Sequence, residues 1–164
     1  MRQPYWRVVE ALDLLKGENK ITDDVFIQSG YSTYKPVHCP FSDFLGFDEM
    51  IKQMANADIV ITHGGTGSIM LVLYHNKIPV VIPRQKKYNE HIDDHQVHFC
   101  KTMEDRGKII AAYETEDLEG ILLNYDERVA GLRKNGPESQ NRAMTQQADL
   151  ISDKLTALCA KWNI

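Results

Sequence analysis

The sequence predicts an α/β protein whose parallel sheet is covered by helices on both faces, and two observations support this fold class. Residues 58–62 (DIVIT) and 79–83 (PVVIP) are short, nearly continuous apolar runs rich in β-branched residues, as in strands buried on both sides. Stretches with the helical spacing of apolar residues lie between and after these runs. This alternation is typical of a Rossmann-like parallel sheet with right-handed crossovers.

The first helix is expected over residues 4–15, and Gly17 is expected to end it. Its apolar residues recur at helical spacing: Trp6, Val9, Leu12, Leu14 and Leu15.

The other elements follow from local composition. Residues 31–44 contain two prolines and mixed polar groups, which predicts a loop with one short strand, and residues 131–140 resemble a linker. The further strands are expected at 24–28, 58–62, 79–83 and 108–112, and the further helices at 47–55, 69–75, 92–105 and 117–125. A last helix, about residues 137–162, carries one narrow apolar stripe that packs either on its own domain or on a partner subunit.

Composition indicates one compact domain, residues 1–164, with an ordinary core. Apolar residues make up 43% and the formal charge is −4, so no basic face for a nucleic acid is expected. No run approaches the length of a membrane span, and the N-terminus lacks the pattern of a signal peptide. The odd number of cysteines (Cys39, Cys100 and Cys159) suggests reduced thiols in the cytoplasm.

A glycine-rich turn follows the strand at residues 58–62 and opens the next helix. Gly64, Gly65 and Gly67 let a ligand approach the backbone closely, while Thr66 and Ser68 add hydroxyl donors. A helix N-terminus carries free N–H groups and a partial positive charge. In open α/β sheets, ligands bind at the carboxyl ends of strands. The turn therefore predicts a phosphate or diphosphate site, with a purely structural turn as the alternative.

The turn matches neither of the common nucleotide-binding loops. It contains no GxxxxGK[ST] and no GxGxxG, which disfavours a P-loop kinase and an ordinary NAD-binding fold.

A polar segment follows the next strand and is expected to share one edge of the sheet with the glycine turn. Carboxylates and amides at a cleft rim suit the hydroxyl groups of a sugar, and basic side chains balance diphosphate charge. The candidate residues are Arg84, Glu90, His91, Asp93, Asp94, His95 and Gln96.

Two alternatives apply to this segment. His91, His95 and His98 lie at helical spacing with Asp94 beside them, which is the pattern of a metal site. Acidic residues such as Asp93 and Asp94 are also common at a solvated helix start. We expect no metal and no cofactor.

The two motifs together resemble a known family. ADIVITHGGTGSI, then VVIPR and YNEHIDDHQ, are similar to the C-terminal domain of GT-B glycosyltransferases. They resemble most the small subunits of split bacterial exopolysaccharide glycosyltransferases. The catalytic subunit of the dolichol-linked N-acetylglucosaminyltransferase looks similar, as does, more distantly, the peptidoglycan lipid II N-acetylglucosaminyltransferase.

The resemblance implies that residues 64–68 hold the diphosphate of UDP and that residues 90–96 face the donor sugar. It implies a membrane-anchored partner subunit that carries the N-terminal half of the fold and the acceptor site. It also implies a cytoplasmic protein held at the inner face of the cell membrane through that partner.

The chain departs from the family in two places. Many relatives have a ribose-binding glutamate in the helix after the turn, where this chain has Met70, Leu71 and Val72. The family also begins with a strand that ends in Gly-Thr before the first helix, whereas here the helix follows Met1 almost at once. We expect that strand to be missing, and hypothesise an internal start or a truncated sequence. The upstream reading frame tests this: no in-frame strand-coding sequence there would reject it.

The expected function is that of a glycosyltransferase subunit in exopolysaccharide or capsule biosynthesis. It would bind a UDP-hexose and transfer the sugar to an undecaprenyl-linked saccharide, with leaving-group charge stabilised by the helix N-terminus and Arg84. The sequence does not fix the catalytic base, for which His63 and Glu90 are candidates. The alternative is a non-catalytic regulatory or scaffolding subunit. A sugar-nucleotide epimerase would need both half-domains in one chain.

Overall fold

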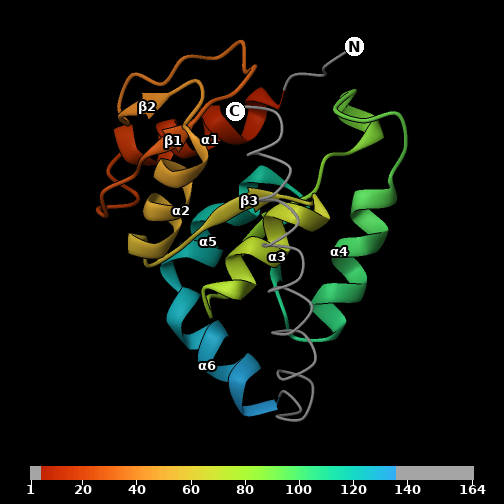
Figure 1. The fold of residues 1–164 in the computed structure, drawn as a ribbon. Helices are drawn as coiled ribbons and strands as arrows, with labels where there is room; N and C mark the ends of the chain where they lie inside the picture. Colours follow the sequence, from red (N-terminus) through yellow and green to blue (C-terminus); the bar gives the residue numbers. More distant parts are fainter. Residues whose placement is uncertain (1–4, 136–164) are drawn as a thin grey trace.

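The structure is a computed structural model and describes residues 5–135. Its helices are α1 (Trp6–Gly17), α2 (Phe47–Asn56), α3 (Thr66–Tyr74), α4 (His95–Asp105), α5 (Leu118–Leu123) and α6 (Tyr125–Asn135). Its strands are β1 (Ile27–Gln28), β2 (Phe41–Ser42), β3 (Ile61–His63), β4 (Val80–Ile82) and β5 (Ile110–Ala111), and short 3-10 turns lie at Lys86–Tyr88 and Thr115–Asp117. Figure 1 shows the arrangement.

All strand pairs are parallel, as expected. β3, β4 and β5 form one sheet in that order, and β1 pairs with β2 in a second, two-stranded sheet. Within residues 5–135 no strand joins the two sheets.

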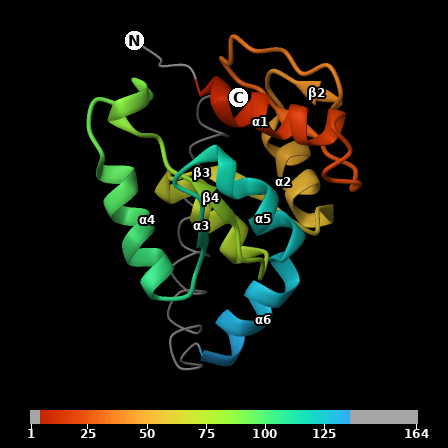
Figure 2. The ribbon, with the colours of Figure 1, turned by 180° about the vertical axis from the view of Figure 1, so that it is seen from behind.

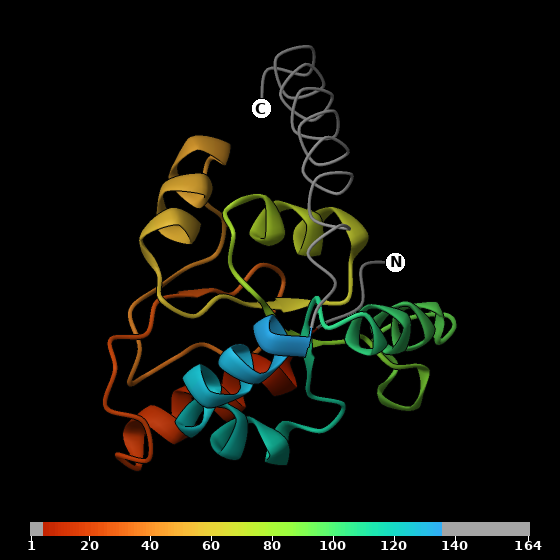
Figure 3. The same ribbon diagram turned by 90° about the horizontal axis from the view of Figure 1, so that it is seen from below.

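Helices cover both faces of the three-stranded sheet. Val81 packs with Ile69 of α3 and with Cys100 and Met103 of α4. The neighbouring residues of β4 point the other way, toward α1, α5 and α6. Figure 3 shows this layering along the sheet, with α3 on one side and α1, α5 and α6 on the other, and Figure 2 shows α5 and α6 in succession on the back.

The first helix buries only part of the expected face. Val8, Val9 and Leu12 are buried, whereas Trp6 and Leu14 are 43% and 46% exposed. Two polar residues, Arg7 and Asp13, take buried positions instead. They do so because each finds partners from distant segments, which the spacing of apolar residues cannot reveal.

Asp13 holds most of the loop that follows β1. Its carboxylate accepts hydrogen bonds from the hydroxyl of Tyr34 (2.8 Å) and from the backbone amides of Val37 (2.9 Å), His38 (2.8 Å) and Cys39 (2.9 Å). Burial by itself raises the pKa of Asp13, but these hydrogen bonds outweigh burial and hold the pKa below its ordinary value. One side chain therefore orders a segment that has little regular structure.

Three expected elements need correction. The strand expected at 58–62 is β3, which begins at Ile61 and ends at His63. β3 is half-buried and is one of the two edge strands of its sheet. The helix expected at 117–125 is instead α5, and a second helix, α6, begins at Tyr125. α6 extends into the expected linker, as far as Asn135, because Val129 and Leu132 pack on the core.

Two expectations remain, one on the C-terminal helix and one on membrane-spanning helices. The helix expected at about 137–162 lies outside the described residues. Among residues 5–135, no helix is long and apolar enough to cross a membrane.

Candidate functional site

The glycine turn and the polar segment lie at one edge of the sheet, as expected. His63 is level with Ile82 in the parallel register, so the turn after β3 and the segment after β4 leave the sheet side by side. The carboxyl ends of parallel strands are where ligands bind in open α/β sheets.

Gly64, in the glycine turn, is buried against α4. A Cβ atom added there would lie 3.0 Å from Sγ of Cys100 and 3.0 Å from Cβ of Gln96. At Gly65, an added Cβ would lie 2.6 Å from Nε2 of His63. A side chain at either position would therefore have to displace its neighbours.

The helix begins inside the expected turn, at Thr66 instead of Ile69. Its N-cap residue is Gly65, no side chain caps the helix, and its first turn contains no acidic residue. Thr66 and Gly67 are exposed and Ser68 is half-buried. The first-turn amides of α3 therefore form an uncapped, positively polarised end at the sheet edge.

Gln96 joins the two segments. Its side chain is buried, and its Oε1 accepts a hydrogen bond from the backbone amide of Arg84 (3.0 Å) while its Cβ packs beside Gly64. The Arg84 guanidinium lies over the ring of Tyr5, 5.0 Å from the ring centroid. Arg84 therefore sits at the sheet edge, beside the residue that precedes α1.

Glu90 lies inside the protein. It is only 3% exposed, and its carboxylate accepts hydrogen bonds from Nε of Arg7 (2.8 Å), Nη2 of Arg7 (3.2 Å) and the backbone amide of Gln85 (3.2 Å). Both oxygens are thus engaged, which suits a residue that shapes the loop.

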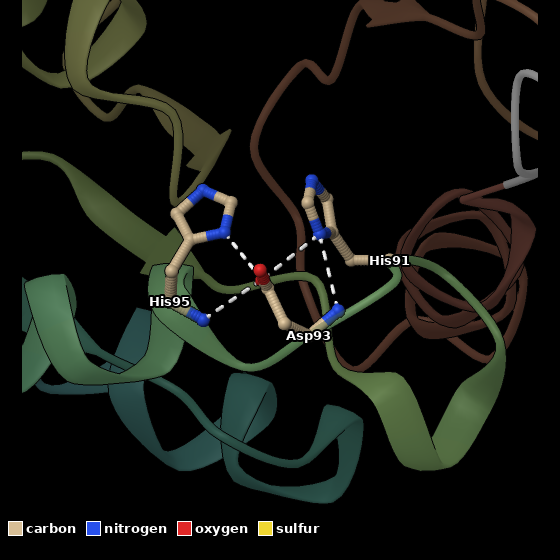
Figure 4. A group of neighbouring side chains, drawn as sticks. All are labelled: His91, Asp93 and His95. Atoms are coloured by element: carbon tan, nitrogen blue, oxygen red, sulfur yellow. Dashed lines mark hydrogen bonds and ion pairs between the residues drawn. The ribbon is translucent and has the colours of Figure 1, made fainter.

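His91, Asp93 and His95 form a cluster at the surface, in which His91 is half-buried and the other two are exposed (Figure 4). Oδ1 of Asp93 lies 3.2 Å from Nδ1 of His91 and 2.5 Å from Nδ1 of His95. The hydrogen bonds from the side chain and backbone amide of His95 lower the pKa of Asp93. The three residues offer ligand atoms within 4.8 Å of one another, so they could hold a divalent transition-metal ion.

This cluster differs from the metal set considered from the sequence. Asp94 is not part of it, because its carboxylate accepts a hydrogen bond from the backbone amide of Lys86 (2.8 Å). His98 is also not part of it. The cluster is already linked internally through Asp93, so its geometry does not require an ion, and the expectation of no metal stays a prediction.

His63 is half-buried at the end of β3, with the ring of Tyr5 edge-on to it (centroids 6.4 Å apart). Burial and the nearby charge of Arg84 lower its pKa. The imidazole is therefore neutral at pH 7 and can accept a proton.

Sequence reasoning missed the contribution of the start of α1 to this edge. Tyr5 contacts His63 and Arg84 and donates a hydrogen bond to the carbonyl of Ile82. Arg7 donates to Glu90 and to the carbonyl of Pro83 (3.1 Å). No local signal marks either residue, because their hydrogen-bond partners lie more than 75 positions away.

Comparisons with known proteins place the chain in a family. Residues 4–155 match the model of the glycosyltransferase family 28 C-terminal domain. The chain is 30% identical over 127 residues to the UDP-N-acetylglucosamine–N-acetylmuramyl-(pentapeptide) pyrophosphoryl-undecaprenol N-acetylglucosamine transferase of Wolbachia pipientis subsp. Culex pipiens (strain wPip). The match covers 76% of this chain and 35% of that protein, so the chain spans about a third of the relative's length. No solved structure matches the chain. Because the family model spans residues 4–155 and the sheet is parallel with helices on both faces, this chain belongs to the glycosyltransferase family 28 C-terminal domain family, of the GT-B type.

Proposed function

We propose that the chain is the donor-binding subunit of a UDP-sugar-dependent hexosyltransferase. The family supports glycosyl transfer, and the Wolbachia relative is named for a UDP-N-acetylglucosamine donor and an undecaprenol-linked acceptor. In this proposal residues 64–68 hold the diphosphate and residues 90–96 line the donor-sugar side.

The uncapped N-terminus of α3 supports the diphosphate site. Three successive amides, those of Thr66, Gly67 and Ser68, belong to the first turn, where the helix itself provides no acceptor. An oxyanion there receives charge-assisted hydrogen bonds and the favourable end of the helix dipole. As the glycosidic bond breaks, the same groups and Arg84 would stabilise the charge that develops on the departing UDP.

The single observation that carries the proposal is Gly67. A Cβ added at this position would meet no atom within 4 Å. In a helix, alanine is more favourable than glycine by about 1 kcal/mol. Gly120 has the same open space, so what distinguishes Gly67 is its place in the uncapped first turn of α3 at the sheet edge, where glycine allows close approach of a phosphate to the backbone.

For the acceptor base, His63 is the candidate that we retain. It is neutral at pH 7 and lies at the end of β3, beside Gly65. Glu90, the other candidate, already accepts hydrogen bonds from Arg7 and Gln85. We therefore propose Glu90 as a structural residue of the donor site.

The remaining parts of the proposal concern the whole enzyme and rest on the resemblance to split glycosyltransferases. We propose that a membrane-anchored partner supplies the N-terminal half of the fold and an undecaprenyl-linked acceptor. The complex would act in exopolysaccharide or capsule biosynthesis at the inner face of the membrane. Co-expression of the chain with such a partner, followed by a sugar-transfer assay, tests this part.

Calorimetric titration with UDP tests the donor site, using three variants. We expect Gly67→Ala to weaken UDP binding by about tenfold, through loss of close approach, and Ser68→Ala to weaken it less. Gly120→Ala is the matched control, because Gly120 is also an exposed helical glycine with no atom within 4 Å of an added Cβ. Equal affinity in all three variants and in the unmodified chain would reject the site.

One observation favours the second candidate, a regulatory or scaffolding subunit. Met70, Leu71 and Val72, where many relatives have a ribose-binding glutamate, are buried apolar residues. Sugar transfer by the co-expressed pair that survives Gly67→Ala at full rate would support this alternative.

A further inference from the structure

A buried ion pair connects the start of α1 with the loop after β4. Nε and Nη2 of Arg7 donate to the two carboxylate oxygens of Glu90, at 2.8 and 3.2 Å. The residues are 83 positions apart, and their side chains are only 9% and 3% exposed. This two-point geometry fixes the orientation of both groups.

The pair also closes the loop on itself. The Glu90 carboxylate accepts the backbone amide of Gln85, and the backbone amide of Glu90 donates to the carbonyl of Gln85, both at 3.2 Å. Arg7 donates in addition to the carbonyl of Pro83, at the end of β4, and lies over the ring of Tyr88, 4.4 Å from its centroid. Arg7 thus contacts the loop at its beginning, its middle and its end.

Glu90 is the first residue of the segment 90–96 that lines the donor-sugar side in the proposed function, and its exposed part follows from His91 on. Its later part is tied to the same loop by Asp94, which accepts from the amide of Lys86, and by Gln96, which accepts from the amide of Arg84. The first part has its anchor at Glu90, and this anchor is held by Arg7. A shift of Glu90 would therefore move the sugar-facing groups while leaving the first turn of α3 in place.

We propose that Arg7 is a positioning residue for the donor sugar: through its fork to Glu90 it sets where the segment of residues 91–96 begins. The inference rests on the proposed function and adds a residue that lies outside both motifs. Lysine could not replace Arg7, because an ammonium group cannot make two parallel hydrogen bonds to one carboxylate. Nη1 of Arg7 is buried and has no hydrogen-bond partner among the described residues, so the guanidinium is held through Nε, Nη2 and the ring of Tyr88.

The test compares the affinities of UDP and of UDP-hexoses, measured by calorimetry on the whole chain. The ratio of UDP-sugar to UDP affinity reports the sugar contacts alone. A panel of UDP-N-acetylglucosamine, UDP-glucose, UDP-galactose and UDP-glucuronate identifies the best ligand of the unmodified chain. For that ligand we expect Arg7→Lys to lower the ratio by about tenfold, which corresponds to the loss of about one hydrogen bond to the sugar, and to leave UDP affinity within about twofold.

Two further variants separate positioning from stability. Lys77→Met is the matched control, because it also removes charge-assisted hydrogen bonds but far from the site. Lys77 donates to the carbonyls of Met54 (2.9 Å), Ala55 (2.6 Å) and Ala57, at the amino ends of the strands. It should lower the Tm without changing the ratio. The double variant Arg7→Met/Glu90→Leu removes both buried charges, and we expect its Tm to exceed that of Arg7→Met while the ratio stays low.

The outcomes distinguish this inference from the proposed function. If the unmodified chain binds neither UDP nor any UDP-sugar, the proposed function fails and this inference with it. If UDP binds and the ratio is unchanged in Arg7→Lys, or recovers with the Tm in the double variant, only the positioning role is overturned. Equal binding of UDP and every UDP-sugar by the unmodified chain would also overturn the role, because no sugar-facing segment would then exist.

Discussion

Gly64→Ala tests the close packing between the glycine turn and α4. The added methyl carbon would lie 3.0 Å from Sγ of Cys100 and from Cβ of Gln96, and 3.1 Å from Oε1 of Gln96. Both neighbours are buried, so neither can move into solvent. Each contact is several tenths of an ångström shorter than an ordinary van der Waals contact, and overpacking of this kind costs about 1–3 kcal/mol.

The expected loss of stability corresponds to a decrease in Tm of about 2–12 °C for a chain of this size. It is measured by urea denaturation and by calorimetric melting. UDP affinity should fall as well, because displacement of Gln96 weakens its hydrogen bond to the amide of Arg84. Adding Cys100→Ala should offset part of the penalty, which a double-mutant cycle measures as a favourable coupling. A Gly64→Ala variant with unchanged Tm and unchanged UDP affinity would refute this reasoning.

Three further predictions concern stability and metal binding. Asp13→Asn should cost about 2–4 kcal/mol of unfolding free energy at pH 7, because charge-assisted hydrogen bonds are lost. Because folding lowers the pKa of Asp13, its ionised carboxylate stabilises the fold above the ordinary pKa of 3.8, and this stabilisation is lost as the pH falls below that value. The free energy of unfolding, measured by urea denaturation, should therefore depend less on acid pH in the variant than in the unmodified chain. Equal dependence on pH in both proteins would contradict the assignment. Lys77→Met should cost about 1–2 kcal/mol, as charge-assisted bonds to the carbonyls at the end of α2 disappear, and a chemical-denaturation midpoint equal to that of the unmodified chain would count against this. Treatment with EDTA should leave UDP affinity unchanged, since the cluster of His91, Asp93 and His95 is linked without an ion; a weaker affinity restored by Zn²⁺ would show a functional metal.

The fold class was predictable because its signals are local. The β-branched run around Val81 and the helical spacing in residues 92–105 report burial directly, and parallel pairing follows from their alternation. The shared edge of the two motifs follows from the same reasoning. The limits of β3 were less accessible, because the residues that pair depend on the length of the neighbouring strand, β4.

The candidate site was predictable only in part. The glycines of the turn are evident in the sequence, but their different roles are not. An added Cβ at Gly64 or Gly65 would lie in close contact with Gln96 or His63, whereas Gly67 has open space around it. Each distinction depends on atoms that the three-dimensional fold brings near.

The buried polar residues of the site could not be predicted from the sequence. On α1, Arg7 falls next to apolar positions and resembles a solvated residue until its partner Glu90 is known. The partner is 83 positions away, and no periodicity connects the two. Such pairs become visible only when packing excludes water from both side chains.

The central claim is that the first-turn amides of α3 bind the diphosphate of a UDP-sugar. The most direct test is a titration of the isotopically labelled chain with UDP, followed by amide nuclear magnetic resonance. We predict that the largest chemical-shift changes fall on Thr66, Gly67 and Ser68, with little change at the amides of β1 and β2. Saturable binding with the largest changes elsewhere, or no binding of UDP at millimolar concentration, would contradict the claim.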